Sequence, residues 1–171
     1  VLSEYQINRF SSVYNLDDPS VQLNEGYQQY QGRLSIGSGQ LFGKGLFNGS
    51  RVESNLVTFQ HSDFIFSVAG EELGFIGCSL LFLVLLLIIV KILLVATKSY
   101  NNEGRIICYG VFSLLASQSV INIGMVLGII PVIGITLPFF SSGGTSVLTI
   151  LLGIGLVQSV YYNKDKTETS G

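Results

Sequence analysis

The stretch from Ile106 to Asn163 contains no Asp, Glu, Lys, Arg or His, and this constrains the fold more than any other feature. One membrane-spanning helix needs about 20 apolar residues, so the stretch is long enough for two spans and a connection. A further uncharged run, Leu73 to Val90, continues past Lys91 and provides a third span. Only 12% of the residues are charged, against about 25% in a soluble domain. The sequence therefore predicts an all-α integral membrane protein.

Polar and proline-containing segments divide the chain into seven parts. Pro131 and Pro138 interrupt a helix, because proline lacks an N–H and clashes with the preceding turn. Lys and Arg in short loops favour the cytoplasmic side; they occur in the hinge after the first span and in the tail, but not in the connection at 131–145. We therefore expect an extracytoplasmic loop (1–69), a transmembrane helix (70–97), a cytoplasmic hinge (98–105), a second transmembrane helix (106–130), an extracytoplasmic re-entrant turn (131–145), a third transmembrane helix (146–162) and a cytoplasmic tail (163–171).

The first 62 residues are polar and rich in Gly and Gln. Two partial helical stripes within them predict short amphipathic helices at the membrane surface: Leu2, Tyr5, Phe10 and Val13, and then Tyr27, Tyr30 and Leu34. There is no initiator Met, basic n-region or cleavage site, so no signal peptide is predicted. A polar start that leads directly into spans indicates a sequence that begins inside a larger protein.

Composition disfavours two classes of function. A net charge of −2 argues against nucleic acid as a partner. Cys78 and Cys108 both fall in predicted spans and have no clustered ligands beside them, so a zinc or redox site is not indicated. We expect both cysteines to act as small apolar side chains in the core.

A glycine-rich run contains the tripeptide Gly43-Lys44-Gly45. Successive backbone N–H groups in such a loop can form an anion-binding nest, and Lys44 would add a positive charge for phosphate. The run is not a Walker A loop, because Gly39 and Gly43 have three residues between them instead of four and Gly45 stands where Ser or Thr is needed. Composition alone favours the alternative of a flexible surface loop.

The segment His61–Gly77 contains the chain's only His and three carboxylates and leads into the first span. At such a boundary a charge must be solvated, paired with an opposite charge or needed for function. Asp63 could cap a helix that starts directly after it, and Glu71 and Glu72 would suit a helix N-terminus. One helix would place Asp63 and Glu71 roughly 12 Å apart, beyond the roughly 5–9.5 Å of paired glycosidase carboxyls. His61 and Asp63 could share a metal ion, although a satisfied or solvated His is the simpler interpretation.

Polar side chains at membrane depth mark a second region of interest. Gln118 and Asn122 are four residues apart in the second span and share a helix face. Hydrogen bonding between helices is the favoured interpretation for them and for Ser113, Ser117 and Ser119. Residues 141–146 run between two spans, where non-helical backbone must be enclosed by protein or line a water-filled cavity. Three spans could hardly enclose it, which again indicates missing helices.

Four blocks make the chain resemble the SEDS family of bacterial membrane proteins, which includes RodA, FtsW and SpoVE. The blocks are residues 26–31, residues 35–46, the segment His61–Gly77, and Asn122-Ile-Gly-Met125 together with residues 131–144. In the family's order they cover most of residues 2–160. The pentapeptide Gly155-Leu-Val-Gln-Ser159 leans weakly toward RodA.

The resemblance implies a ten-span fold in the bacterial cytoplasmic membrane, of which this chain holds the last three spans and the preceding extracytoplasmic loop. It implies a peptidoglycan glycosyltransferase that polymerises lipid II beside a class B penicillin-binding protein, with its active site on the extracytoplasmic face. The family's catalytic acidic residue falls on Asp63, a general base for the acceptor 4-hydroxyl while undecaprenyl pyrophosphate leaves. A divalent cation, Mg²⁺ or Mn²⁺, would assist at the pyrophosphate. The expected substrate-binding residues are Lys44, Gly43, Gly45, His61, Gln118, Asn122, Ser141, Gly143 and Gly144.

The chain also departs from the family pattern. Val57-Thr58-Phe59 stands where the family has Leu-Pro-Glu, so a carboxylate close to Asp63 is missing. Ser62 replaces a Thr, and three further departures fall in the re-entrant block: Ile133, Thr136 and Ser142 for Thr, Pro and Tyr. These departures suggest a divergent or less active member.

Two other classes of function fit the same features. A lipid II transporter, or flippase, would depend on Gln118, Asn122 and the turn at 141–146, whereas a non-catalytic scaffold would only assemble cell-wall enzymes. Replacing Asp63 with Ala discriminates between them, because only the glycosyltransferase needs its carboxylate. We expect the 171 residues alone to be inactive, since part of the site would lie in missing spans.

Overall fold

The computed structural model describes residues 26–49, 63–99, 101–140 and 144–168, together with Ser11, Val13, Pro19 and Val21; for residues 164–168 only the backbone is described. The described regular structure is entirely helical. Its elements, in chain order, are α3 (Tyr27–Gly39), α5 (Ile65–Lys98), α6 (Asn102–Val126) and α7 (Gly144–Glu168).

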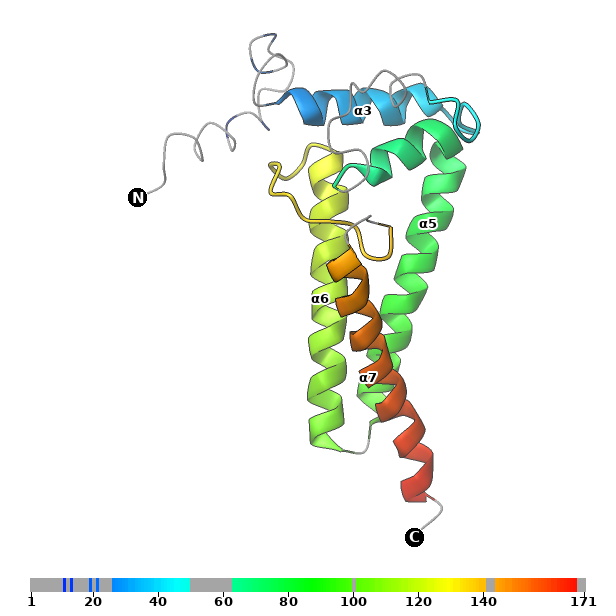
Figure 1. The fold of residues 1–171 in the computed structure, drawn as a ribbon, viewed down its shortest axis with the longest axis vertical. Helices are drawn as coiled ribbons and strands as arrows, with labels where there is room; N and C mark the ends of the chain where they lie inside the picture. Colours follow the sequence, from blue (N-terminus) through cyan, green and yellow to red (C-terminus); the bar gives the residue numbers. More distant parts are fainter. Residues whose placement is uncertain are drawn as a thin grey trace.

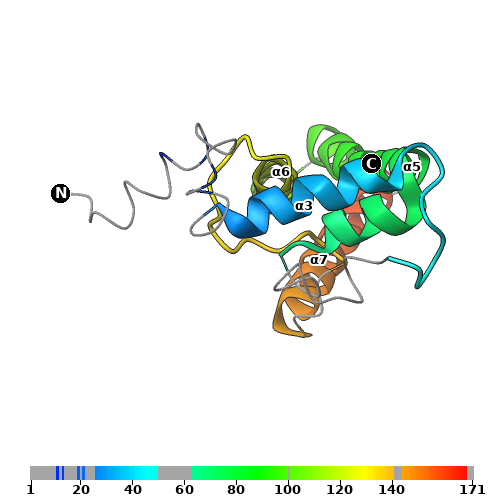
Figure 2. The ribbon, with the colours of Figure 1, turned by 90° about the horizontal axis from the view of Figure 1, so that it is seen from above.

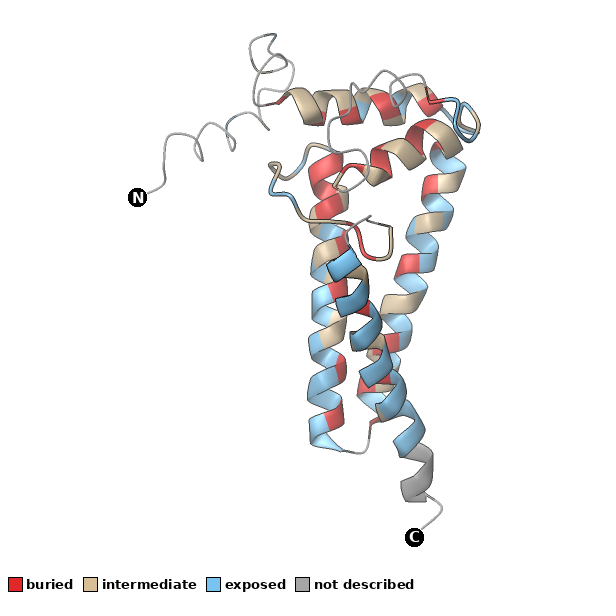
Figure 3. Ribbon diagram, in the orientation of Figure 1, coloured by how far each residue is buried: buried red, intermediate tan, exposed pale blue. Residues whose placement is uncertain are grey.

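Three of these helices are long and apolar enough to cross a membrane: Ile65–Lys98, Asn102–Val126 and Gly144–Asn163. The expectation of an all-α membrane protein with three spans is therefore confirmed. Figure 1 shows α5, α6 and α7 side by side, with α3 lying across one end of the bundle, which we call the α3 end. Large apolar side chains along the three long helices are exposed, as expected for surfaces that face lipid or further helices (Figure 3).

The helix bounds differ from the expected spans at several ends. α5 begins at Ile65 and contains a break at Gly74, whose φ of 68° and ψ of −166° are not helical. Residues 65–73 lie beside α3, and the long membrane-crossing part of α5 follows the break (Figures 1 and 2). α6 ends at Val126, before Pro131, and residues 131–137 form no regular structure. The early end of α6 leaves these residues to fold back along the bundle.

Small residues let α3 approach the first part of α5 closely. The buried residues of α3 are Gln29, Gly32, Ser35 and Gly39, which recur every three or four positions and form one face. A side chain on Gly39 would collide with the carbonyl oxygen of Gly70, and one on Gly70 would collide with Ile36. Gly39 of the glycine-rich run thus serves helix packing. The predicted stripe Tyr27, Tyr30 and Leu34 is half-buried in α3, whereas the earlier stripe lies, except for Val13, outside the described residues.

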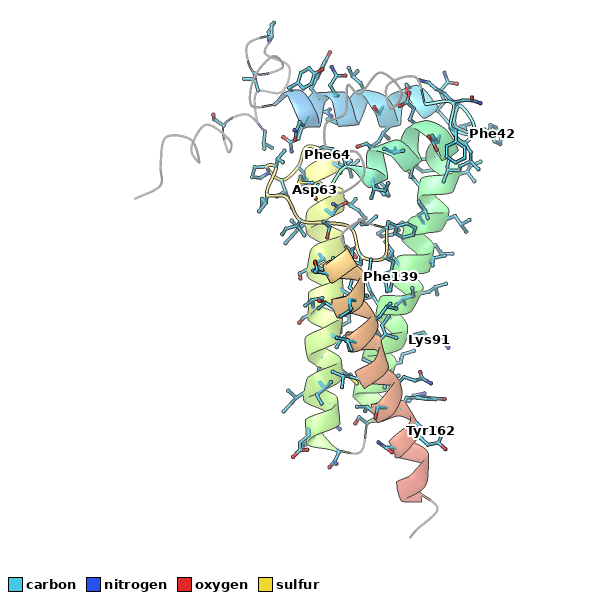
Figure 4. The ribbon with its side chains drawn as sticks, in the orientation of Figure 1. Phe42, Asp63, Phe64, Lys91, Phe139 and Tyr162 are labelled. Atoms are coloured by element: carbon cyan, nitrogen blue, oxygen red, sulfur yellow. The ribbon has the colours of Figure 1, made fainter. Side chains whose placement is uncertain are left out.

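The core consists of two apolar clusters stacked along the bundle. The cluster at the α3 end contains Phe64, Phe66, Cys78, Leu85, Met125, Val126 and Leu137. The other contains Ile92, Ala96, Cys108, Leu115, Ile150 and Val157. Phe139, from the segment after α6, packs against both (Figure 4). Both cysteines are free and buried, which confirms their role as apolar side chains.

Candidate functional site

The side chain of Asn122 joins three segments at the α3 end of the bundle. It is fully buried, and its Nδ2 donates to the carbonyl oxygens of Asp63, at 2.8 Å, and Ile135, at 2.6 Å. These carbonyls belong to the residues before α5 and to the irregular segment after α6. Buried carbonyls outside regular structure need a donor, and Asn122 supplies both. It therefore fixes the position of Asp63 against the 131–137 segment.

A second buried amide, that of Gln29 in α3, holds the same region from the other side. Gln29 Nε2 donates to the carbonyl of Met125, at 2.9 Å, and to that of Ile130, at 2.6 Å. The end of α6 and the first residues after it are thus tied to α3. Gln29 was not among the predicted site residues, because its role depends on carbonyls about a hundred residues away in sequence.

Asp63 lies immediately outside the helix. The N-cap of α5 is Phe64, with no side-chain capping hydrogen bond, so the interpretation of Asp63 as an N-cap is wrong. Asp63 is half-buried, and its Oδ2 lies 3.5 Å from where a Cβ would stand on Gly134. Figure 4 shows Asp63 beside the upper end of α6. Within the described ranges its carboxylate makes no hydrogen bond or ion pair, so the side chain is positioned through its own backbone.

Residues 40–45, which we call the glycine-rich loop, fit against the break in α5 and satisfy the backbone groups that the break exposes. The amides of Lys44 and Gly45 donate to the carbonyls of Glu71 and Glu72, both at 3.0 Å. After the break, the amides of Phe75 and Ile76 donate to the carbonyls of Gln40, at 2.8 Å, and Leu41, at 3.2 Å. An interrupted helix leaves such groups without partners, and near a membrane that is costly. The loop therefore makes the break tolerable.

The two glycines at this contact have no tolerated substitute. Gly43 and Gly74 both have positive φ, 77° and 68°. A Cβ on Gly43 would collide with the carbonyl oxygen of Glu72, and one on Gly74 would collide with the backbone nitrogen of Gly43. Both the dihedral angles and the close approach require glycine.

An ion pair closes this contact. Lys44 Nζ lies 2.6 Å from Glu71 Oε1; the Glu71 side chain is fully buried, and that of Lys44 is 30% exposed. A buried carboxylate requires a charged or hydrogen-bonding partner, and Lys44 provides one. The pair forms between residues 27 positions apart, so no local sequence pattern indicates it.

These contacts correct two predictions. The anion-binding nest at Gly43–Gly45 is wrong, because all three amides donate to backbone carbonyls, that of Gly43 to Gly39. The expected helix N-terminus at Glu71 and Glu72 is not the start of α5, whose first turn contains no acidic residue; both lie just before the break at Gly74, after which the membrane-crossing part begins. A phosphate contact by Lys44 itself stays a prediction, and its ammonium is bound to Glu71 here.

The polar residues of α6 divide into two groups. Ser113, Ser117 and Ser119 donate to carbonyls three or four residues earlier in α6, so hydrogen bonding between helices is wrong for them. Among these membrane-depth side chains, Asn122 is the one that bonds to other segments in the described part of the chain. One turn below it, Gln118 Oε1 is buried and has no hydrogen-bond partner in the described part of the chain. Contact between these two amides and a substrate stays a prediction.

The structure describes only some of the remaining predicted residues. His61, Ser141 and Gly143 lie outside the described residues, as do the departures at 57–59, Ser62 and Ser142. Gly144 is the exposed first residue of α7. Thr136, another departure, lies 3.4 Å from the Ser146 hydroxyl and links the irregular segment to α7. Among the described residues no group of three His, Cys, Asp or Glu could hold a metal ion.

Comparison with known proteins shows the family to which the chain belongs. The family model described as "Cell cycle protein", that of FtsW, RodA and SpoVE, matches residues 1–166. The chain belongs to the FtsW/RodA/SpoVE family. This is the family expected from the four sequence blocks.

Individual members of the FtsW/RodA/SpoVE family match over nearly the whole chain. Peptidoglycan glycosyltransferase MrdB of Escherichia coli strain K12 is 35% identical over 96% of this chain and 44% of its own length. Stage V sporulation protein E of Bacillus subtilis strain 168 is 39% identical over 91% of this chain and 42% of its own length. MrdB is a RodA protein, which gives weak support to the leaning toward RodA. The chain thus spans less than half the length of these relatives.

A solved structure shows the same fold. It is the structure of a peptidoglycan synthase complex in which polymerization and crosslinking are coordinated, and one of its chains matches with a TM-score of 0.71 and 28% identity. The match covers 95% of this chain and 43% of that chain.

The family's sequence blocks meet at the α3 end of the bundle. The block at 26–31 contributes Gln29, and the block at 35–46 contributes the loop that fits against the break in α5. The two remaining blocks contribute Asp63 and Asn122, joined by a hydrogen bond. Residues that are distant in sequence thus build one framework around the half-buried Asp63 carboxylate.

Proposed function

We propose that the full-length protein is a peptidoglycan glycosyltransferase that polymerises lipid II, with Asp63 as its catalytic residue. The observation that carries the proposal is the placement of Asp63. Its backbone is held by a buried Asn122, while its half-buried carboxylate makes no hydrogen bond or ion pair in the described part of the chain. A carboxylate with a purely structural role would be expected to cap a helix, pair with a cation or bridge two hydrogen-bond donors. The glycosyltransferase name of the relative MrdB supports the same conclusion.

In this proposal Asp63 accepts the proton of the 4-hydroxyl of the acceptor sugar. That oxygen forms the new glycosidic bond, and undecaprenyl pyrophosphate leaves from the donor sugar. A general base must lie within hydrogen-bond reach of the proton it removes. The buried amide of Asn122 favours this by holding the backbone of Asp63, and that of Gln29 by tying the end of α6 to α3.

A divalent cation, Mg²⁺ or Mn²⁺, remains part of the proposal only as an ion carried by the pyrophosphate of the substrate. Such an ion would neutralise the charge of the leaving group. The described residues do not form a metal site of their own, since they contain no group of three possible ligands. No role of Asp63 in the proposal depends on the ion.

We place the α3 end on the extracytoplasmic side of the bacterial cytoplasmic membrane. The positive-inside rule supports this orientation, because Lys98 and Arg105 lie at the opposite end of the bundle. We also propose a class B penicillin-binding protein as the partner. The structural match to a chain of a peptidoglycan synthase complex supports action within such an assembly.

The test is polymerisation of purified lipid II by the full-length protein together with its penicillin-binding partner. Asp63→Asn removes the base but preserves shape, and we expect glycan synthesis to fall by about 100-fold or more. Glu72→Gln is the matched control, because it neutralises a half-buried carboxylate nine positions away and should retain activity. Folding of each variant is checked by partner binding and by thermal stability.

Normal polymerisation by a well-folded Asp63→Asn protein would overturn the catalytic role of Asp63. Absence of glycan synthesis by the wild-type complex, with lipid II transferred across vesicles instead, would favour the transporter class. Absence of both activities, with assembly of the complex retained, would favour the scaffold.

A further inference from the structure

Residues 41–47, which we call the apolar loop, expose four large apolar side chains. Leu41, Phe42, Leu46 and Phe47 are 59%, 80%, 62% and 83% exposed. Figure 4 shows Phe42 on the outer side of the structure, beside the bend in α5. Soluble surfaces rarely expose apolar groups in such a cluster, and a contiguous patch marks an interaction site.

The apolar loop holds these side chains outward because its backbone is tied to α5. Four backbone hydrogen bonds join residues 40–45 to residues 71–76, two on each side of the break at Gly74. The Lys44–Glu71 ion pair and the close contact of Gly43 with the backbone of α5 add to this attachment. The apolar side chains are therefore presented by a built structure.

The attachment also sets the level of the apolar loop relative to the membrane. Phe75 and Ile76, whose amides bond to it, are the first residues of the membrane-crossing part of α5, and both are more than half exposed. Leu80, one turn further along, is also exposed. The apolar loop thus lies beside the start of the membrane-crossing part of α5 and extends its apolar outer surface. It does so at the depth where that helix enters the membrane (Figures 1 and 2).

We propose that the apolar loop inserts Phe42, Phe47 and their two Leu neighbours into the lipid leaflet at the α3 end. The ligand is the membrane lipid itself, at the boundary between headgroups and acyl chains. Aromatic and aliphatic side chains favour this boundary when the backbone beneath them is hydrogen-bonded. Lys44 lies in the middle of the apolar loop, and its pairing with the buried Glu71 directs its charge toward the protein. The inserted loop anchors the start of α5 laterally and independently of the catalytic proposal.

The test is electron paramagnetic resonance depth measurement on the full-length protein in phosphatidylglycerol–phosphatidylethanolamine nanodiscs. A nitroxide is attached at Phe42→Cys, Phe47→Cys or Leu46→Cys, each in a background without other reactive cysteines. Arg33→Cys, on the exposed side of α3, is the aqueous reference, and Leu83→Cys, exposed in the middle of α5, is the membrane reference. Oxygen concentrates in the bilayer and a nickel chelate stays in water, so the ratio of their accessibilities reports depth.

We expect the labels at 42, 46 and 47 to show a ratio of oxygen to nickel accessibility at least several-fold above the Arg33→Cys reference and approaching the Leu83→Cys reference. A ratio equal to that of Arg33→Cys would overturn the proposal, because the apolar loop would then lie in water. Low accessibility to both reagents would also overturn it, because protein would then cover these side chains. Three separate label sites keep the outcome readable if one variant misfolds.

Discussion

Removing the ammonium of Lys44 tests how the glycine-rich loop is held against α5. Lys44→Met keeps a side chain of similar length but removes the ammonium that lies 2.6 Å from the fully buried Glu71 carboxylate. Breaking a buried ion pair in this way costs about 3–5 kcal/mol, because the remaining charge is desolvated. Glu71→Gln removes the buried charge instead, and the 30% exposed Lys44 can turn to water. That variant should lose about 1.5–3 kcal/mol, the value of a charge-assisted hydrogen bond.

The double variant Lys44→Met/Glu71→Gln decides whether the two effects share one cause. No buried charge remains in it, so we expect a loss of about 1.5–3 kcal/mol, less than that of Lys44→Met alone. The two single losses sum to about 4.5–8 kcal/mol, and the shortfall in the double variant measures the coupling between the side chains. The assay is equilibrium unfolding of the full-length protein in mixed detergent micelles, followed by far-ultraviolet circular dichroism.

Arg33→Met is the matched control, since it removes an exposed cation from the neighbouring helix α3 and should change the unfolding free energy by no more than about 0.5 kcal/mol. The reasoning is refuted if Lys44→Met is as stable as Arg33→Met. A double variant whose loss equals the sum of the single losses would likewise show that the ion pair does not act as a unit. In either case the ion pair would not be what stabilises the contact between the glycine-rich loop and α5.

Other predictions follow from the backbone and from the buried amides. Gly74→Ala should destabilise the protein by about 3 kcal/mol or more, because φ is 68° and the new Cβ collides with Gly43. Gly155→Ala, in open space on α7, should be neutral or slightly stabilising in the same unfolding assay. Asn122→Leu leaves two buried carbonyls without donors and should cost about 2–4 kcal/mol. It should also reduce lipid II polymerisation, whereas Ser113→Ala, which loses only a bond within α6, should do neither.

Much of the architecture could be predicted from the sequence, because it depends on local composition. A long uncharged stretch has few alternatives to membrane helices, since only intrahelical hydrogen bonds satisfy the backbone in lipid. Proline explains in the same way why the chain stays irregular from Pro131 to Pro138. The apolar character of the two cysteines also followed from their positions in spans. These predictions use residues that are close together in the chain.

The helix break at Gly74 and its support by the glycine-rich loop could not be predicted in this way. The glycines at 43 and 74 are thirty-one positions apart, both have positive φ, and their backbones approach closely. Glycine-rich composition is equally typical of flexible loops and anion-binding nests. Only the fold shows that the amides of this loop are bonded to α5. Lys44 and Glu71 were each noticed as charges, but their pairing needed the tertiary contact.

The sequence by itself determined the class of the protein and its three spans, and it singled out Asp63 as the candidate catalytic residue, because hydropathy and motif order are properties of the chain. The tertiary structure decided what surrounds Asp63: Asn122 holds its backbone, Phe64 takes the N-cap position, and Gly134 lies beside its carboxylate. It also decided that Lys44 and Glu71 form an ion pair. The physical reason is that buried polar groups must find partners, and in a helical bundle those partners come from segments far apart in sequence.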